Sequence, residues 1–228
     1  MGAVDVARSG LCRMIASGQL QCGQPLPGEV ELCERFGVSR SSLREAQKML
    51  VVAGVLTSEP GSRTFVSQMT PQQIMSGLEI VVPLLPLDRF LGLFPLREVL
   101  EGHTAAQAAA RMSDADRVRL LSVAHELGRT EPSERAQELD AEFHQLIIHS
   151  AEDPLIEALL EAIRRRGRDY HIFDTGDGAQ LKPLSDKAHV RIAEAISRRD
   201  PESARFLAME HVRTTRRWLE GLQPHPTL

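Results

Sequence analysis

Four residues in the second half of the chain have side chains that bind divalent transition metals. Asp140 and His144 stand four positions apart in an amphipathic segment, so a helix places both side chains on one face. His189 and His211 follow in two further segments with helical periodicity. Carboxylate and imidazole groups from three helices of a bundle can meet in its interior and hold a metal ion. Helical histidines serve more often in packing or at the surface, so the spacing alone leaves this hypothesis open.

A second set of residues, near the N-terminus, has the chemistry of nucleic-acid recognition. Arg40, Arg44 and Lys48 recur every four residues, which gathers three cations on one face of a helix. Short hydroxyl side chains stand at the start of the same helix: Ser39, Ser41 and Ser42. Arginine suits bidentate contact with guanine or phosphate, and hydroxyls at a helix N-terminus suit phosphate. A solvated basic stripe on a core helix has the same spacing, so two interpretations stand.

The elements around this basic helix predict a winged helix-turn-helix domain over residues 1–68. We expect helices over residues 4–17, 29–36 and 40–53, and two short strands over residues 55–58 and 64–67. Gly37 separates the second helix from the third, which is the one expected to enter the DNA major groove. The face of the third helix opposite its cations is apolar and should pack on the core: Val38, Leu43, Ala46, Met49 and Leu50.

The remainder of the chain predicts a linker and an all-α domain. Residues 69–87 are interrupted by prolines and a glycine, so we expect a linker that carries one short helix. From residue 88 to about residue 222 the periodicity is helical. The expected helices span residues 88–111, 114–127, 133–151, 154–172, 182–199 and 201–221. The predicted fold class is therefore mainly α, a winged helix-turn-helix followed by a helical bundle.

Composition narrows the class of protein. Of the 228 residues, 42% are hydrophobic and 25% are charged, values that suit a packed globular protein and argue against wholesale disorder. The longest apolar stretch, residues 78–87, is too short and too interrupted to cross a membrane. The N-terminus lacks a signal-peptide pattern, and the three cysteines fit neither a disulfide framework nor a metal clip. We expect a cytoplasmic protein without a membrane partner.

The N-terminal residues resemble the DNA-binding domain of the GntR family of bacterial transcription regulators. The resemblance covers about residues 5–68 and rests on Gly18-Gln19-Leu20, Leu26-Pro27, Glu31-Leu32, Phe36-Gly37-Val38-Ser39-Arg40, Leu43-Arg44-Glu45-Ala46, Gly54, and Gly61 with Thr64-Phe65-Val66. It implies a set of DNA contacts, with the wing-tip glycine in the minor groove: Ser39, Arg40, Ser41, Ser42, Arg44 and Gly61. The family usually has arginine where this chain has Val30, so we expect its operator affinity or preference to differ.

The C-terminal part resembles the FCD ligand-sensing domain of FadR-type GntR regulators over about residues 88–220. The resemblance rests on Leu96-Arg97, Leu100-Glu101, Ala105 to Arg111, Asp140 with His144, His189 with Ile192 and Ala195-Ile196, Asp200-Pro201, and Ala204 to His211. It implies a divalent transition metal (zinc, nickel or manganese) on Asp140, His144, His189 and His211. Acyl-CoA-sensing members lack this set. Asp153 stands where asparagine is usual, which puts the local ligand contacts in doubt.

Arg97 is the candidate for effector binding. The FCD resemblance implies that it faces the cavity and pairs with an anionic effector, while an ion pair with Glu101, four residues on, is the alternative. The arginine run, Arg164, Arg165, Arg166 and Arg168, is interpreted as a solvated helix face from which Arg168 alone could approach the cavity. The histidines without support from the resemblance are interpreted as surface or packing residues: His103, His125, His149 and His171.

Together these features predict a homodimeric, metabolite-responsive transcription regulator, and specifically a repressor. Two recognition helices of a dimer fit a palindromic operator with half-sites one helical turn apart. A small carboxylate effector would favour an arrangement of the helical domains that spaces these helices badly for DNA. Two alternatives stay open. One is a metal-dependent hydrolase, although no H-E-x-x-H motif is present; the other is a regulator with a purely structural metal and no effector.

Overall fold

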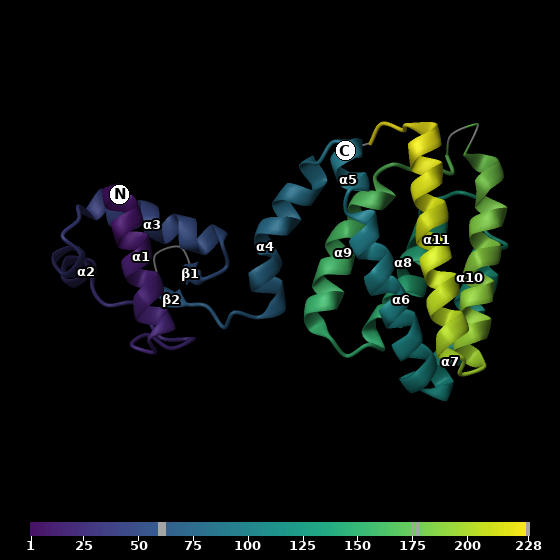
Figure 1. Ribbon diagram of the computed structural model, residues 1–228, viewed down its shortest axis with the longest axis horizontal. Coiled ribbons are helices and arrows are strands. Elements are labelled where there is room, and N and C mark those ends of the chain that lie inside the picture. Colours follow the sequence, from purple (N-terminus) through teal and green to yellow (C-terminus); the bar gives the residue numbers. More distant parts are fainter. Residues whose placement is uncertain (59–62, 175, 177, 227–228) are drawn as a thin grey trace. The chain divides into compact units, whose positions relative to one another are not determined.

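The computed structural model describes residues 1–58, 63–174, 176 and 178–226 of the chain. Two packing units separate within it, Met1–Val81 and Val82–Leu228 (Figure 1). Helices dominate both units and the one sheet of the described residues has two strands, which confirms the predicted mainly α fold class. Among the described helices, none has the length and apolar character needed to cross a membrane.

Three helices build the core of the N-terminal unit: α1 (Ala3–Ala16), α2 (Glu29–Phe36) and α3 (Arg40–Val52). Their buried apolar residues form one cluster with the sheet: Ala7, Leu11, Met14, Leu20, Leu32, Leu43, Ala46, Leu50, Leu56 and Val66. Gly37 ends α2 with a φ of 66°, a left-handed conformation that glycine adopts without steric cost. The Ser39 side chain then caps α3 by accepting a hydrogen bond from the Ser42 amide.

A short antiparallel hairpin, β1 (Leu56–Ser58) with β2 (Thr64–Val66), completes the winged helix. Leu56 pairs with Val66 in its register. The chain before α2 adds to the edge of β2, because the amide of Val66 donates to the Gln24 carbonyl at 2.8 Å and Leu26 donates to Thr64 at 2.8 Å. The segment before α2 therefore covers the outer edge of β2.

Helix α4 (Pro71–Val81) belongs to the N-terminal unit and occupies much of the predicted linker region. Gly54, just after α3, has a φ of +73°, and a Cβ at this position would overlap the backbone carbonyl of Gln73. The Ser76 hydroxyl also donates to the Val52 carbonyl at 3.3 Å. The start of α4 therefore packs directly on the end of α3.

The C-terminal unit is a helical bundle in which α6 and α11 run side by side (Figure 1). Its helices are η1 (Val82–Leu84), α5 (Leu87–Leu91), α6 (Phe94–Arg111), α7 (Asp114–Leu127), α8 (Glu134–His149), α9 (Pro154–Arg168), η2 (Ala179–Leu181), α10 (Lys182–Ser197) and α11 (Pro201–Leu222). A core of alanines with larger apolar residues joins α6, α7, α8, α10 and α11; Ala105, Leu120, Phe143, Ile192 and Ala204 are among its members. Many alanines at this core let the helix axes approach closely.

Two predicted helices have different bounds in the structure. The helix expected over residues 88–111 is divided into α5 and α6 at Gly92, because Pro95 has no amide proton and its ring would clash with the carbonyl four residues earlier. The helix expected to reach residue 172 ends at Arg168, since His171 has a left-handed φ of 44°. Two apolar residues beyond its end, Tyr170 and Ile172, pack on Phe90 and its neighbours.

Candidate metal and effector site

Three histidines from three helices converge inside the C-terminal unit. His144 of α8, His189 of α10 and His211 of α11 are exposed by 4%, 1% and 6%, respectively. One ligand nitrogen from each lies within 4.8 Å of the other two, and Nε2 of His144 is 3.3 Å from Nε2 of His189. Two nitrogens bound tetrahedrally to one metal at about 2.1 Å would be about 3.4 Å apart. The spacing therefore suits a shared metal ion.

Asp140 lies beside this histidine cluster, one turn before His144 on α8. Its Oδ1 is 3.7 Å from Nε2 of His144 and 3.5 Å from Nε2 of His189. Its Oδ2 accepts a hydrogen bond of 3.1 Å from Nη2 of Arg164. The structure thus brings together all four residues that the sequence offers as metal ligands, with one carboxylate oxygen directed at two of the imidazoles.

Burial of the three imidazoles favours their neutral form, which is the form that binds metal. Burial lowers the pKa of His144 and His211 well below the ordinary value, and the neighbouring imidazoles and Arg164 add to this effect. Burial also lowers the pKa of His189, against the opposing effect of Asp140. Within the described part of the chain, Nδ1 of His189 and Nδ1 of His211 have no hydrogen-bond partner. Neutral nitrogens and one carboxylate are a donor set that fits a divalent transition metal.

Glu101 of α6 lies beside His144 and links the histidine cluster to two arginines. It is exposed by only 4%, and its Oε2 is 3.6 Å from Nδ1 of His144. Arg97 donates to it through Nε, and Arg164 donates to its two oxygens at 3.0 and 3.2 Å. Burial alone would raise the pKa of Glu101, but the two guanidinium groups outweigh it and hold that pKa below the ordinary value. A charged Glu101 is placed to orient the imidazole of His144.

The charges of this buried and partly buried network balance without a metal. Arg97 and Arg164 contribute two positive charges, and Glu101 and Asp140 contribute two negative charges. The ion pair of Arg97 with Glu101 is the alternative considered from the sequence, and it is present; Arg97 also lines the adjoining cavity, as its proposed effector role requires. Both interpretations of Arg97 thus have a counterpart in the structure.

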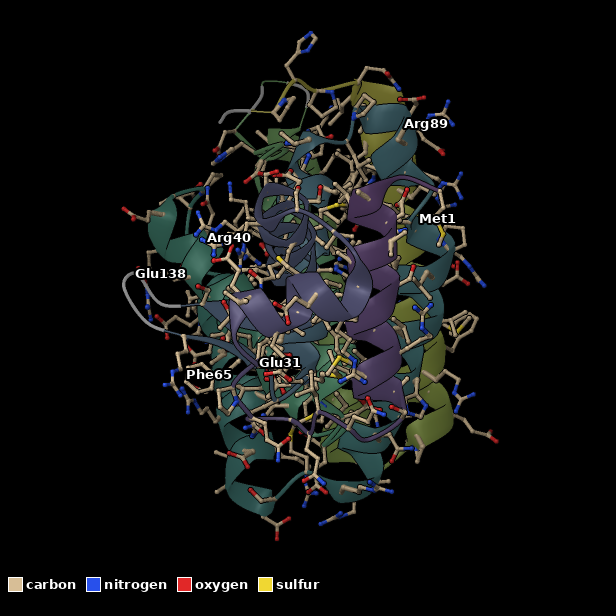
Figure 2. All side chains as sticks on the ribbon, turned by 90° about the vertical axis from the view of Figure 1, so that its left-hand side faces the viewer. Met1, Glu31, Arg40, Phe65, Arg89 and Glu138 are labelled. Atoms are coloured by element: carbon tan, nitrogen blue, oxygen red, sulfur yellow. The ribbon has the colours of Figure 1, made fainter. Side chains whose placement is uncertain are left out.

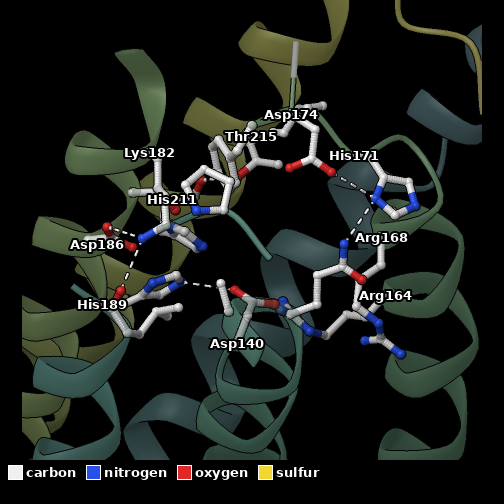
Figure 3. A pocket seen from close by; sticks show the side chains of 18 of the residues that line it. Asp140, Arg164, Arg168, His171, Asp174, Lys182, Asp186, His189, His211 and Thr215 are labelled. Atoms are coloured by element: carbon white, nitrogen blue, oxygen red, sulfur yellow. Dashed lines mark hydrogen bonds and ion pairs between the residues drawn. The ribbon is translucent and has the colours of Figure 1, made fainter. Parts of the chain in front are cut away.

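A cavity of about 120 Å³ opens beside the histidine cluster (Figure 3). Its polar walls include Arg97, Asp140, Arg164, Arg168, His171, Asp174, Lys182, Asp186, His189 and His211. Figure 3 shows His189, His211, Lys182 and Asp186 on one side, with Arg164, Arg168 and His171 across from them. Such a space has room for a small polar molecule.

The interpretation of the arginine run as a solvated face is wrong for two of its members. Arg164 and Arg166 are exposed by 6% and 4%, because Glu101, Asp140 and the Leu85 carbonyl accept from them. The sequence carried one signal for Arg164, since it follows the buried Leu160 by four residues and so continues the buried face of α9.

His171 is a cavity residue that the sequence interpretation missed. Its ring nitrogen Nδ1 is 2.9 Å from Nε2 of Gln137 and 3.1 Å from Oδ2 of Asp174. Figure 3 places His171 and Asp174 together at the edge of the cavity. His171 has a left-handed backbone conformation just after α9, and this turn places its side chain at the cavity. Hydrophobic periodicity does not predict such a turn.

The candidate DNA-binding residues of the N-terminal unit lie at the start of α3 and on its exposed face (Figure 2). Arg40 is exposed, and among the described residues no acidic group pairs with it. Arg44 is exposed too, but its Nε and Nη2 donate to the two oxygens of Glu29 at 2.8 and 3.0 Å. Oγ of Ser39 is within 2.9 Å of the hydroxyls of both following serines, Ser41 and Ser42. Gly61 lies outside the described residues.

Two apolar residues near this face are exposed. Val30, which stands where the GntR family usually has arginine, is 54% exposed on α2 beside Glu29. Met49, expected on the core face of α3, is 42% exposed, whereas Leu43, Ala46 and Leu50 are buried as predicted. The helix turns by about 100° per residue, so the buried stripe reaches Leu50 and leaves Met49 at its edge.

Two family models account for most of the chain. Residues 5–66 match the bacterial regulatory proteins of the gntR family, and residues 92–214 match the FCD domain. The chain belongs to the GntR family of bacterial regulators and carries an FCD domain. Its relatives are transcription regulators rather than enzymes, so the metal-dependent hydrolase considered above is not supported. The protein is a DNA-binding transcription regulator.

Similar proteins include both activators and repressors. The chain is 29% identical to the Glc operon transcriptional activator of Escherichia coli, over 96% of this chain and 89% of that protein. It is 26% identical to the galactonate operon transcriptional repressor of Escherichia coli, over 93% of this chain and 94% of that protein. A solved structure, Streptococcus agalactiae GntR, is 26% identical with a TM-score of 0.51 and covers 94% of this chain and 99% of its own.

Proposed function

We propose that this GntR regulator is a cytoplasmic homodimeric repressor whose release from a palindromic operator is controlled by a small carboxylate. The carboxylate binds at a divalent metal in the FCD cavity. One observation carries the proposal: three buried imidazoles and Asp140 lie together at the wall of a cavity, and Arg164 and Arg168 line its opposite side. A purely structural metal would not need that cavity.

Four residues would hold the metal: Asp140, His144, His189 and His211. Zinc, nickel and manganese all accept this donor set, and the bound ion would act as a Lewis acid toward an oxygen ligand. Asp140 is already neutralised by Arg164, and Glu101 by Arg97 and Arg164. The two positive charges of the metal therefore remain uncompensated by the protein, which favours an anionic ligand from outside.

A carboxylate is the anion that best suits this cavity. Its oxygens bind a transition metal and accept paired hydrogen bonds from arginine. Arg97, which the FCD resemblance assigns to this role, and other arginines line the space, and its volume of about 120 Å³ limits the ligand to a small molecule. One relative is named as the repressor of the galactonate operon, and galactonate is itself a carboxylate.

The DNA-binding end of the mechanism uses the exposed start of α3. Ser39, Ser41 and Ser42 present hydroxyls at the helix N-terminus to phosphate, while Arg40 and Arg44 reach bases or phosphates. The GntR resemblance assigns the minor groove to Gly61, which lies outside the described residues. In a homodimer two such helices read the two half-sites. The effector acts by favouring an arrangement of the dimer in which their spacing no longer matches the operator.

Operator release by carboxylates tests this function. The protein is stripped with a chelator, reloaded with zinc, nickel or manganese, and bound to an operator selected from random DNA. Acetate, L-lactate, succinate and D-galactonate are then titrated. We expect at least one to release the reloaded protein from DNA and to leave the stripped protein bound. A reloaded protein that stays on DNA at millimolar concentrations of all four would favour a regulator with a structural metal and no effector.

A further inference from the structure

One cation of the cavity wall is used neither by the metal cluster nor by the network behind it. Arg168, at the end of α9, lines the cavity and is half-buried. Its neighbours in the arginine run all have acidic partners: Arg164 with Glu101 and Asp140, Arg165 with Glu161 at 3.8 Å, and Arg166 with Asp169 at 3.6 Å. Within the described part of the chain, no carboxylate or carbonyl pairs with Arg168.

The surroundings of Arg168 make an unpaired charge there unfavourable. Burial lowers its pKa, and the positive charge of Arg164, one turn earlier on the same helix, lowers it further, while Asp140 and Glu161, which form no ion pair with it, only partly oppose this effect. A guanidinium group nonetheless stays protonated at neutral pH. A cation that is half removed from water and next to a second cation is stabilised by an anion in the cavity.

The other two cavity arginines are committed to buried acids. Arg97 is 4% exposed and donates to Glu101, and Arg164 makes three hydrogen bonds of 3.0 to 3.2 Å to Glu101 and Asp140. If either turned to an effector, a buried carboxylate would lose its counter-charge, which costs several kcal/mol. Arg168 can bind an anion without breaking any such pair.

We propose that Arg168 is the residue that binds the anionic group of the effector, and that Arg97 is a positioning residue. Arg97 fixes Glu101, which in turn lies beside Nδ1 of His144. The assignment rests on the proposed carboxylate-responsive function and refines it. The carboxylate then lies between the metal and the α9 wall, the two sides of the cavity that face each other in Figure 3.

Calorimetric titration of the metal-reloaded protein without DNA tests the assignment. The probe is whichever of acetate, L-lactate, succinate and D-galactonate binds the parent protein most tightly. For Arg168→Gln we expect affinity to fall about 10- to 100-fold, as for a lost hydrogen bond to a charged group, with metal content and operator affinity unchanged. Arg168→Lys keeps the positive charge but loses the planar guanidinium group that binds two oxygens at once. Its effector affinity should lie between those of the parent and Arg168→Gln. Arg165→Gln, three residues earlier on α9 and exposed, is the matched control.

The outcomes separate this assignment from the proposed function. Parent affinity in Arg168→Gln would overturn the assignment, and so would a loss in Arg97→Gln that leaves its metal content intact. If the parent binds a carboxylate that Arg168→Gln does not bind, but no carboxylate releases the operator, the assignment stands and the proposed function fails. A parent that binds none of the four acids contradicts both.

Discussion

At the scale of single residues, Glu101 is the acid on which the site depends most. Glu101→Gln would leave Arg97 and Arg164 without their shared carboxylate and His144 without its neighbour. We expect the free energy of unfolding to drop by about 3–5 kcal/mol and metal affinity to drop about 10- to 100-fold. Chemical denaturation and metal titration measure the two effects. Glu138→Gln, in an exposed pair with Arg135, should change neither.

The two arginines of α3 should respond differently to substitution. Among the described residues Arg40 forms no ion pair, so it can bind DNA without first leaving an acidic partner. Arg40→Ala should therefore weaken operator binding by about 1–3 kcal/mol. Arg44 must first leave Glu29, which competes with DNA for its guanidinium group. We therefore expect Glu29→Gln to raise operator affinity, as measured by fluorescence anisotropy at moderate salt. Unchanged binding in Arg40→Ala would mean that α3 is not the recognition helix.

The FCD resemblance named the four candidate metal ligands, but the sequence did not reveal the charged residues that surround them. The structure brings His144, His189 and His211 together and places Asp140 beside them, but their spacing in the sequence alone left a packing or surface role open. Arg164 looks like a surface residue because its charge belongs in water. Arg164 is stabilised in the interior by Glu101, which is 63 positions away in the sequence. The residues around Arg164 do not reveal a partner that distant.

At the scale of elements, the junction of α3 and α4 makes a sharp test of the N-terminal unit. Gly54→Ala puts a Cβ onto the Gln73 carbonyl and also strains a φ of +73°. We expect a loss of about 1–2 kcal/mol from backbone strain and about 1–3 kcal/mol more from overpacking. Gly18 has nearly the same φ, +76°, but open space around its Cα, so Gly18→Ala should show the strain alone. Equal thermal stability of the two variants would contradict the packing of α4 on α3.

Helix existence followed from periodicity, whereas helix ends did not. The bundle helices α7, α10 and α11 lie within about two residues of their predicted spans, since capping residues such as Ser113 and Asp200 mark their starts. The break before α6 and the early end of α9 were missed. In both places apolar residues continue past the helix end and pack on the core around Phe90, so hydrophobicity alone does not mark the boundary.

At the scale of the whole molecule, symmetric operator binding requires two copies of the chain. We expect sedimentation at micromolar concentration to give a homodimer both free and on DNA. Dimer formation would be independent of Arg40, because that residue is placed at the DNA surface; the Arg40→Ala variant is therefore a suitable control. A monomer under both conditions would contradict the palindromic operator.

Metal content tests the central claim most directly. Elemental analysis of the isolated protein should give one divalent transition metal per chain. His144→Ala and His189→Ala, which remove buried imidazoles of the cluster, should lose most of it and unfold at lower temperature. His149→Ala, on the same helix as His144 but with 83% of its side chain exposed, should keep the metal. Equal metal content in all four proteins, or none in any of them, would contradict the account.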